Sequence, residues 1–182
     1  MTTALLVIDM QDEFLGMTTT ALPNVLKLID HFKAHHLPIF FTQHGHTKEE
    51  LTPPYKNQIV RRWGPSGSIA IGTEAWQLIP EIAQRVEGYP VVAKNTYDAF
   101  INTNLGELLS ENQVERVIVS GVMTNCCCDT TARSAGNRGF ETWLVEDACG
   151  SVTKKQHEAG LMGFGFAFGD VVETAGVMSQ FR

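Results

Sequence analysis

The sequence has 182 residues, and its 14 Lys and Arg against 20 Asp and Glu give a formal net charge of −6 at pH 7. A chain of this length fits one domain over residues 1–182, and with 43% hydrophobic and 19% charged residues it is globular rather than disordered. The acidic balance and the lack of a basic block give no support for nucleic-acid binding.

The N-terminus reads MTTALLVIDMQDEF, without the basic residues of a signal peptide, and no run of about 18 apolar residues occurs in the chain. We therefore expect no contact with a membrane. Three of the cysteines are consecutive, at 126–128, and a fourth is Cys149. Neighbouring cysteines seldom cross-link a fold, so we expect reduced thiols and a cytoplasmic location.

Short apolar runs alternate with helical patterns along the chain. In chain order, we expect strand 4–8, helix 23–36, strand 38–42, helix 73–79 with Thr73 as its N-cap, strand 89–93, helix 103–110, strand 114–119, helix 125–138, strand 142–145, helix 153–164 and strand 170–173. This alternation predicts a three-layer α/β/α sandwich around a mostly parallel, Rossmann-like sheet of about six strands.

The longest stretch without a clear pattern is 43–72, which contains the adjacent prolines Pro53 and Pro54. A loop of this length in a compact domain is usually a lid or a binding loop. A dinucleotide site is not expected, because no G-x-G-x-x-G motif follows the first strand and the glycine-rich GFGFAFG near the C-terminus follows a helix.

In a parallel sheet, ligands bind beyond the carboxyl ends of the strands. Asp9 ends the first expected strand, where a carboxylate serves either as a general base or as a turn cap. Lys94 ends the third, and its ammonium is expected to pair with a carboxylate, to stabilise a thiolate or to reach solvent.

The segment SGVMTNCCCDTTARSA leaves the fourth expected strand and enters a helix near Asn125. A cysteine at the start of a helix lies close to unpaired backbone N–H groups and to the positive end of the helix dipole, which favours the thiolate and offers donors for an oxyanion. The same pattern also fits three small apolar side chains that pack the first helical turn. Both interpretations, nucleophile and packing residue, are open from the residues alone.

Three segments together resemble the isochorismatase-like cysteine hydrolases. ALLVIDMQDEF resembles the opening strand of this superfamily with its D-x-Q pattern, VVAKNTYDAF its lysine segment, and VIVSGVMTNCCCDTTARSAGNRGF its nucleophile segment. The three motifs occur in the family order and cover nearly the whole chain. The resemblance implies an Asp9, Lys94 and Cys127 triad, with Cys126 and Cys128 as neighbours of the nucleophile.

The resemblance also implies a cis peptide bond between Val122 and Met123, with an oxyanion hole formed by the backbone N–H groups of Met123 and Cys127. The implied activity is hydrolysis of an amide-type C–N bond of a small molecule through a Cys127 thioester, with Asp9 moving the proton. Members of the superfamily usually form dimers or tetramers, so we expect a homo-oligomer.

The chain departs from one branch of the family, the nicotinamidases, which bind a divalent metal through a D-x-H motif and a later histidine. Here FTQHGHTKEE places His44 at the aspartate position and His46 at the following histidine. We expect no metal and no cofactor, with His44 and His46 either in the substrate pocket or in solvent.

The segment RRWGPSGSIAIGTEAW resembles the substrate-side loop of the family. Arg61 or Arg62 would bind a substrate carboxylate, and Trp63 would wall the pocket, unless these side chains lie in water or at a subunit contact. The other candidate substrate-binding residues are Phe14, Gln43 and Trp76, although Phe14 and Trp76 also fit the core.

Two alternatives to amide hydrolysis remain open at this point. The branch that gives the superfamily its name cleaves the vinyl ether of isochorismate, and its cysteine is not essential. A member of the fold without catalytic activity is the second alternative, although a complete set of Asp9, Lys94 and Cys127 argues against it.

Overall fold

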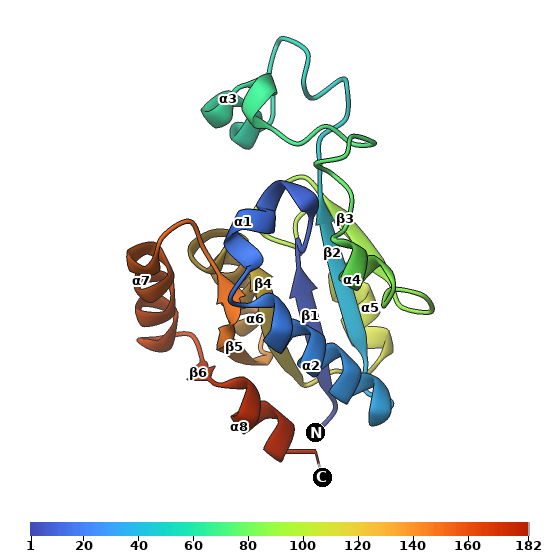
Figure 1. Cartoon of the computed structure of the whole chain (residues 1–182), viewed down its shortest axis with the longest axis vertical. Helices are drawn as coiled ribbons and strands as arrows, with labels where there is room; N and C mark the ends of the chain where they lie inside the picture. The colour runs from blue at the N-terminus through green and yellow to red at the C-terminus, as the bar shows by residue number, and fades with distance from the viewer. Residues whose placement is uncertain (182) are drawn as a thin grey trace.

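The computed structural model describes residues 1–181 and shows a six-stranded sheet in the order β3-β2-β1-β4-β5-β6, in which every pairing is parallel. The strands are β1 (Thr3–Ile8), β2 (Ile39–His44), β3 (Val91–Lys94), β4 (Arg116–Val122), β5 (Glu141–Gly150) and β6 (Asp170–Val172). This confirms the predicted α/β sandwich, and the sheet is fully parallel rather than mostly so (Figure 1).

Helices cover both faces of the sheet because the central strands are apolar on both sides. The longer helices are α2 (Leu22–Ala34), α5 (Leu105–Glu111), α6 (Asp129–Asn137) and α7 (Lys154–Gly165). The shorter ones are α1 (Leu15–Thr18), α3 (Gln58–Trp63), α4 (Pro80–Ala83) and α8 (Thr174–Ser179), with 3-10 turns at Asp12–Phe14 and Pro65–Gly67. None of the helices in the described part of the chain is long and apolar enough to cross a membrane.

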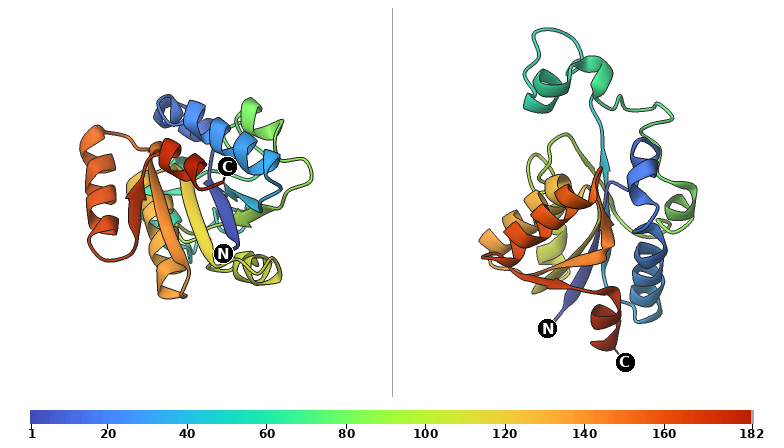
Figure 2. Two further views of the ribbon diagram at one scale, coloured as in Figure 1. Left: turned by 90° about the horizontal axis from the view of Figure 1, so that it is seen from below. Right: turned by 60° about the vertical axis from the view of Figure 1, so that its left-hand side comes forward.

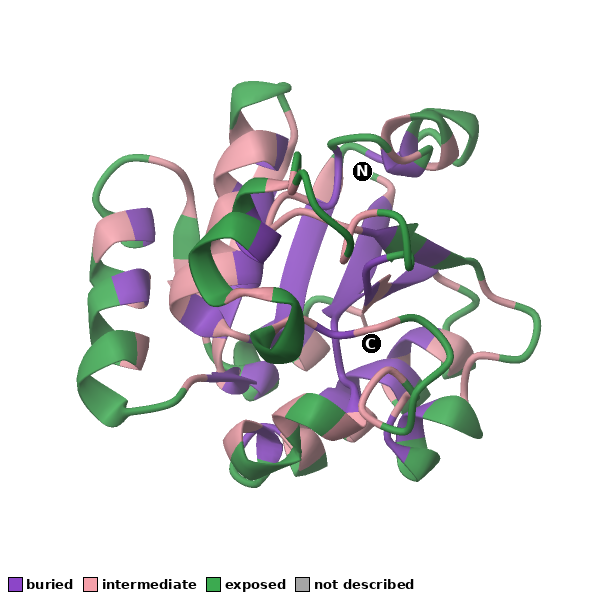
Figure 3. Cartoon of the chain, turned by 90° about the horizontal axis from the view of Figure 1, so that it is seen from above, coloured by how far each residue is buried: buried purple, intermediate pink, exposed green. Residues whose placement is uncertain are grey.

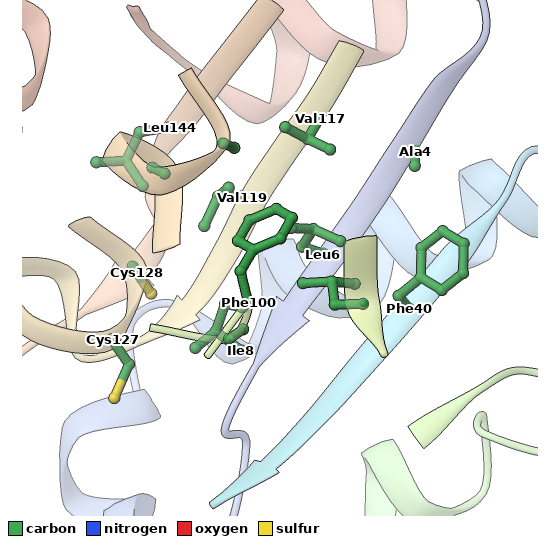
Figure 4. Packing of buried hydrophobic residues seen from close by; sticks show 14 of the residues in the cluster. Ala4, Leu6, Ile8, Phe40, Phe100, Val117, Val119, Cys127, Cys128 and Leu144 are labelled. Carbon is green, nitrogen blue, oxygen red and sulfur yellow. The ribbon is translucent and has the colours of Figure 1, made fainter. Parts of the chain in front are cut away.

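The core consists of two layers, one on each face of the sheet. Leu5 and Val7 of β1 point to the layer formed with α2, α4 and α8, whereas Leu6 and Ile8 point to the layer formed with α5, α6 and α7. Figure 4 shows part of the second layer, and Figure 2 shows the helices on the two sides of the sheet. Successive side chains of a strand point to opposite faces of the sheet. A strand whose two faces are both covered by helices is therefore apolar along its whole length.

One predicted helix is wrong. Residues 73–79 form turns instead, and the Thr73 hydroxyl donates to the Ala70 carbonyl at 2.8 Å rather than capping a helix. The segment runs beside the chain after β1, where Asp12 N–H donates to the Gln77 carbonyl at 2.9 Å. Because its carbonyls are used by these neighbours, they are not free to form a helix.

The stretch 43–72 is only partly a loop. It begins with the last two residues of β2 and contains α3, whose N-cap Asn57 accepts a hydrogen bond from the Ile59 N–H at 2.8 Å. Figures 1 and 2 show that this segment projects beyond the carboxyl ends of the strands. Figure 3 looks onto that end and shows the buried strands surrounded by helices with exposed outer faces.

Candidate active site

Three strands deliver the candidate catalytic side chains to one place. Asp9 directly follows β1, Lys94 is the last residue of β3, and Cys127 lies in a π-helical turn, Thr124–Cys128, after β4. The Lys94 Nζ atom lies 2.7 Å from the Asp9 Oδ2 atom and 3.4 Å from the Cys127 Sγ atom. The structure thus brings together three residues that are far apart in the sequence.

The Asp9 carboxylate is fixed by Thr42 of β2. The Thr42 hydroxyl donates to Asp9 Oδ1 at 2.6 Å, and its oxygen accepts from the Asp9 N–H at 3.0 Å. Asp9 has a positive φ of 47°, which the short polar side chain of aspartate tolerates better than most residues. This turn of the backbone and the Thr42 contacts hold the carboxylate at the carboxyl edge of the sheet.

Lys94 is a buried ammonium with four neighbours. Besides Asp9 and Cys127, its Nζ atom donates to the Thr96 carbonyl at 2.8 Å and lies 3.4 Å from His44 Nδ1. Burial alone would lower the pKa of Lys94, but the Asp9 carboxylate and Cys127 outweigh it and raise the pKa above its ordinary value. The side chain is therefore charged and pairs with a carboxylate, which decides between the alternatives that the sequence left open.

The turn that carries Cys127 depends on a close approach between β4 and β1. Gly121 has a φ of 111°, and a Cβ atom there would lie 2.1 Å from the Ile8 carbonyl oxygen. Only glycine fits this position. The following peptide bond, Val122–Met123, is cis, and the chain then enters the π-helical turn.

The Cys127 thiol is buried, with 5% of the residue exposed. Burial raises the pKa of this thiol, the Lys94 ammonium opposes the effect, and the Asp9 carboxylate adds to it. With its pKa raised, the thiol is protonated at rest, in contrast to the thiolate that the helix-start position favours, and burial is the largest cause. Figure 4 shows the Cys127 side chain pointing away from the labelled core residues.

Cys127 borders a cavity of about 280 Å³. Its walls are mostly apolar and come from the segment after β1, from the 43–72 segment, from the loop after β3, from the Cys127 turn and from the loop between β5 and α7. The lining residues are Glu13, Phe14, Met17, His44, Ile59, Trp63, Gly67, Ser68, Ile69, Tyr97, Met123, Cys127 and Val152. The volume lies near the lower end of the range for ligand pockets, so the cavity suits a small molecule.

The candidate substrate-binding residues divide into three groups. Phe14, His44 and Trp63 line the Cys127 cavity, and the Trp63 indole N–H donates to the Tyr97 hydroxyl at 2.9 Å. Gln43 and Trp76 line a second, smaller cavity of about 190 Å³ and are joined by a hydrogen bond from Gln43 Nε2 to the Trp76 carbonyl at 2.9 Å.

The remaining three candidates, Arg61, Arg62 and His46, do not line the Cys127 cavity. Both arginines are exposed, and the Arg62 guanidinium lies 5.4 Å from the Trp63 ring centroid. His46 is fully buried, which excludes the solvent alternative for this residue. Its ring packs edge-on against His44 at 4.9 Å, which places it behind the histidine that borders the cavity.

The two histidines do not fit a metal site. His44 Nδ1 lies 3.4 Å from the Lys94 ammonium, and a second cation beside that charge would be repelled. The nearest carboxylate to His46 is Glu50, whose Oε1 atom is 3.8 Å from Nδ1. Within residues 1–181, no group of three or more His, Cys, Asp or Glu side chains is arranged to hold a metal ion.

Two residues that hold the site together, Thr42 and Gln11, are not among the candidates that the sequence predicts. Thr42 positions Asp9, and Gln11 fixes the end of β2 by accepting from the His44 N–H at 2.7 Å and donating to the His44 carbonyl at 2.9 Å. Gln11 belongs to the D-x-Q pattern, so its presence is recognisable from the sequence. The pattern does not predict that Gln11 binds the His44 backbone. No signal in the sequence connects Thr42 with Asp9, because their contact depends on the register of β1 against β2.

Comparisons with known proteins identify the family to which the chain belongs. The isochorismatase domain family matches residues 3–176. Nicotinamidase 3 of Arabidopsis thaliana is 42% identical over 171 residues, which cover 93% of this chain and 84% of that protein. Enterobactin synthase component B of Escherichia coli is 26% identical over 94% of this chain and 60% of that protein.

Solved structures agree as well. N-carbamoylsarcosine amidase from Thermoplasma acidophilum superposes with a TM-score of 0.80 at 26% identity, over 96% of this chain and 97% of that one. A nicotinamidase from Bacillus subtilis has a TM-score of 0.82 at 22% identity, over 95% and 100%, which supports the fold alone.

A parallel α/β sandwich with a cysteine, a lysine and an aspartate at the carboxyl edge of its sheet is the arrangement of a cysteine hydrolase. The chain belongs to the isochorismatase family of hydrolases.

Proposed function

We propose that this hydrolase cleaves the amide-type C–N bond of a small molecule, with Cys127 as the nucleophile. The observation that carries the proposal is the contact chain from the Asp9 carboxylate through the Lys94 ammonium to the Cys127 thiol, at 2.7 and 3.4 Å, beside a cavity that Cys127 itself borders. A nucleophile, a proton acceptor and a fixed positive charge are the groups that thiol-based acyl transfer requires.

The mechanism follows from the resting charges. Because the Cys127 thiol is protonated at rest, it needs a base at the moment of attack, and the Asp9 carboxylate is the acceptor for that proton. The thiolate adds to the amide carbon while the Lys94 ammonium stabilises the negative charge. Asp9 then returns the proton to the leaving amine, which departs and leaves a Cys127 thioester. Water hydrolyses the thioester and regenerates the thiol.

The backbone N–H groups of Met123 and Cys127 are the proposed oxyanion hole. Both residues line the cavity, and no backbone hydrogen bond from the Met123 N–H is present among residues 1–181. Donors directed at the developing oxyanion typically supply about 3 kcal/mol of transition-state stabilisation each.

Relatives guide the choice of first substrate. The 42% identical relative is a nicotinamidase, and a structural neighbour is an N-carbamoylsarcosine amidase, so both names support cleavage of a C–N bond. Hydrolysis of a vinyl ether is the competing activity, since enterobactin synthase component B is also a relative. A cysteine in contact with a buried lysine and aspartate favours the amidase.

The test is ammonia release from a panel of small carboxamides, with nicotinamide first, by the wild type and by Cys127→Ala. We expect Cys127→Ala to lose at least about a thousandfold in kcat, because removal of the nucleophile removes the covalent pathway. Asp9→Asn is expected to lose activity to a similar extent.

The matched control is Cys126→Ala, which removes a half-buried thiol from the same turn without touching the cavity lining. Circular dichroism checks that each variant is folded. Turnover of an amide by Cys127→Ala at near wild-type rate rejects the mechanism, and turnover of isochorismate by that variant supports the vinyl-ether alternative.

A further inference from the structure

Helix α7 packs against the Cys127 turn and contacts it through a histidine. The helix begins after Thr153, whose hydroxyl oxygen accepts from the Gln156 N–H at 3.2 Å and caps the helix. This cap fixes the place of the first helical turn. His157 belongs to that turn, and its Nδ1 atom lies 2.7 Å from the Thr124 hydroxyl oxygen.

The direction of this hydrogen bond follows from the second contact of Thr124. A hydroxyl group has one proton, and Thr124 donates it to the Gly150 carbonyl at 2.9 Å. The bond to His157 therefore takes its proton from the ring, so that Nδ1–H donates and the Thr124 oxygen accepts. Burial lowers the pKa of His157 and outweighs the opposite effect of Glu146 and Glu158, so the ring is neutral near pH 7. The single proton of the ring then lies on Nδ1.

Thr124 connects His157 to the groups that carry the proposed reaction. It is fully buried and begins the π-helical turn that contains Cys127. It also follows Met123 directly, and the backbone N–H groups of Met123 and Cys127 are the proposed oxyanion donors. A buried oxygen that loses its donor is left as an unpaired acceptor, which costs free energy and favours a shift of the chain. A shift of Thr124 moves the residues on both sides of it.

A second contact joins the same two segments of the chain. The Ser151 hydroxyl, in the loop before α7, donates to the Asn125 Oδ1 atom at 2.6 Å. This contact uses neither His157 nor Thr124. A variant of His157 therefore keeps one of the two side-chain contacts, and the expected displacement is confined to the start of the Cys127 turn.

His157 lies outside the cavity in which the substrate is proposed to bind. It does not line the Cys127 cavity, and it borders a separate, polar cavity of about 490 Å³ with Glu146 and Asp147. A side chain in this position does not touch the reacting atoms and acts only through the turn.

We propose that His157 is a positioning residue whose Nδ1–H bond to Thr124 holds the Cys127 turn in its reactive geometry. The assignment rests on the proposed role of Cys127 as the nucleophile, but not on the identity of the substrate. Because His157 lies outside the substrate cavity, its loss is expected to lower kcat more than it changes KM.

The experiment compares two replacements that differ in one N–H group. His157→Leu removes the donor, whereas His157→Asn places an amide N–H close to the position of Nδ1. We expect His157→Leu to lower kcat about tenfold, the factor that one hydrogen bond provides, with a change in KM of less than about twofold. His157→Asn should recover most of the lost kcat. Circular dichroism checks that both variants are folded.

The matched control is Glu158→Gln. Glu158 is an exposed neighbour of His157 and raises its pKa, so this variant changes the charge beside the ring but keeps the Nδ1 bond. Its kcat should equal that of the wild type. The proposal is overturned if His157→Asn is no more active than His157→Leu, or if KM changes as much as kcat. Equal loss in Glu158→Gln and His157→Leu also overturns it, because the effect would then be one of charge.

A measurement that needs no turnover separates this proposal from the proposed function. At pH 7, ¹⁵N NMR of the wild type should show a proton on Nδ1 of His157 and none on Nε2, in signals that are missing from the spectrum of His157→Leu. A proton on Nε2 alone overturns the proposal whatever the protein hydrolyses. A wild type with the Nδ1 proton that hydrolyses no amide rejects only the amidase, and the same comparison of kcat is then made with isochorismate.

Discussion

The protonation state of His44 affects the free energy of unfolding of the protein. The pKa of an exposed histidine is about 6.5, and burial lowers that of folded His44 to about 4. A base with a depressed pKa binds its proton more tightly in the unfolded chain, so acid favours unfolding. The stability from a neutral His44 is present above about pH 6.5 and is lost as the pH falls toward 4.

We therefore predict that acid destabilises the wild type more than His44→Phe, which has no proton to bind at this position. Between pH 7 and pH 5 the wild type should lose about 2 kcal/mol of unfolding free energy beyond the loss of the variant. Urea denaturation at the two pH values measures the difference. Parallel loss in the two proteins would mean that His44 is not a buried neutral group.

Sequence motifs identified the proposed catalytic residues but not the residues that position them. Asp9, Lys94 and Cys127 are recognisable because each ends a strand or begins a helix in a family pattern. Thr42 and Thr96 lie in segments that the sequence comparison covers, but their contacts with Asp9 and Lys94 are recognisable only in three dimensions, because each depends on strand register or on a local turn. The protonated state of Cys127 was also unpredictable, because it depends on burial and not on position along a helix.

At the level of elements, the Cys127 turn is braced by α7. Gly160 of α7 faces the turn so closely that a Cβ atom there would lie 2.9 Å from the Cα atom of Asn125. The side chain of His157, one turn earlier, lies 2.7 Å from the Thr124 hydroxyl, which in turn donates to the Gly150 carbonyl at 2.9 Å. The position of Cys127 therefore depends on the fit between α7 and this turn.

We predict that Gly160→Ala moves α7 away from the turn, lowers the unfolding free energy by about 1–3 kcal/mol and reduces kcat more than KM. The matched control is Gly176→Ala in α8, where no atom lies within 4 Å of the added Cβ atom. That change should be neutral or slightly stabilising, because alanine favours a helix over glycine. Equal effects of the two substitutions would contradict the bracing role.

The predicted elements were correct where periodicity was strong and wrong where tertiary contacts used the backbone. All six strands and the helices near 23–36, 103–110, 125–138 and 153–164 are present. Residues 73–79 have a helical pattern, but the Trp76 carbonyl accepts hydrogen bonds from the side chains of Gln11 and Gln43 instead of from a helix backbone. The first turn of the predicted helix at 125–138 is π-helical, a local geometry that apolar spacing does not encode.

The whole molecule presents an apolar surface on the outer face of α7. Of the aromatic residues near the C-terminus, Phe164 is fully buried, whereas Phe166 is 90% exposed and Met162, four residues earlier, is 75% exposed. Residues four apart on a helix lie on one face, so the two side chains form one patch. Exposed apolar patches are costly in water unless another surface covers them.

We predict that a second copy of the chain covers this patch and that the protein is a homo-oligomer. Light scattering coupled to gel filtration should give at least twice the 20.1 kDa mass of one chain. The double variant Met162→Glu, Phe166→Glu should shift the mass toward the monomer, because burial of two carboxylates in an apolar contact is unfavourable.

The controls separate loss of the contact from loss of the fold. Circular dichroism must show that the double variant stays folded. The Lys154→Gln variant, which changes an exposed charge of the same helix, should keep the wild-type mass. A monomeric wild type at micromolar concentration would contradict the prediction and would leave the α7 patch as ordinary exposed surface.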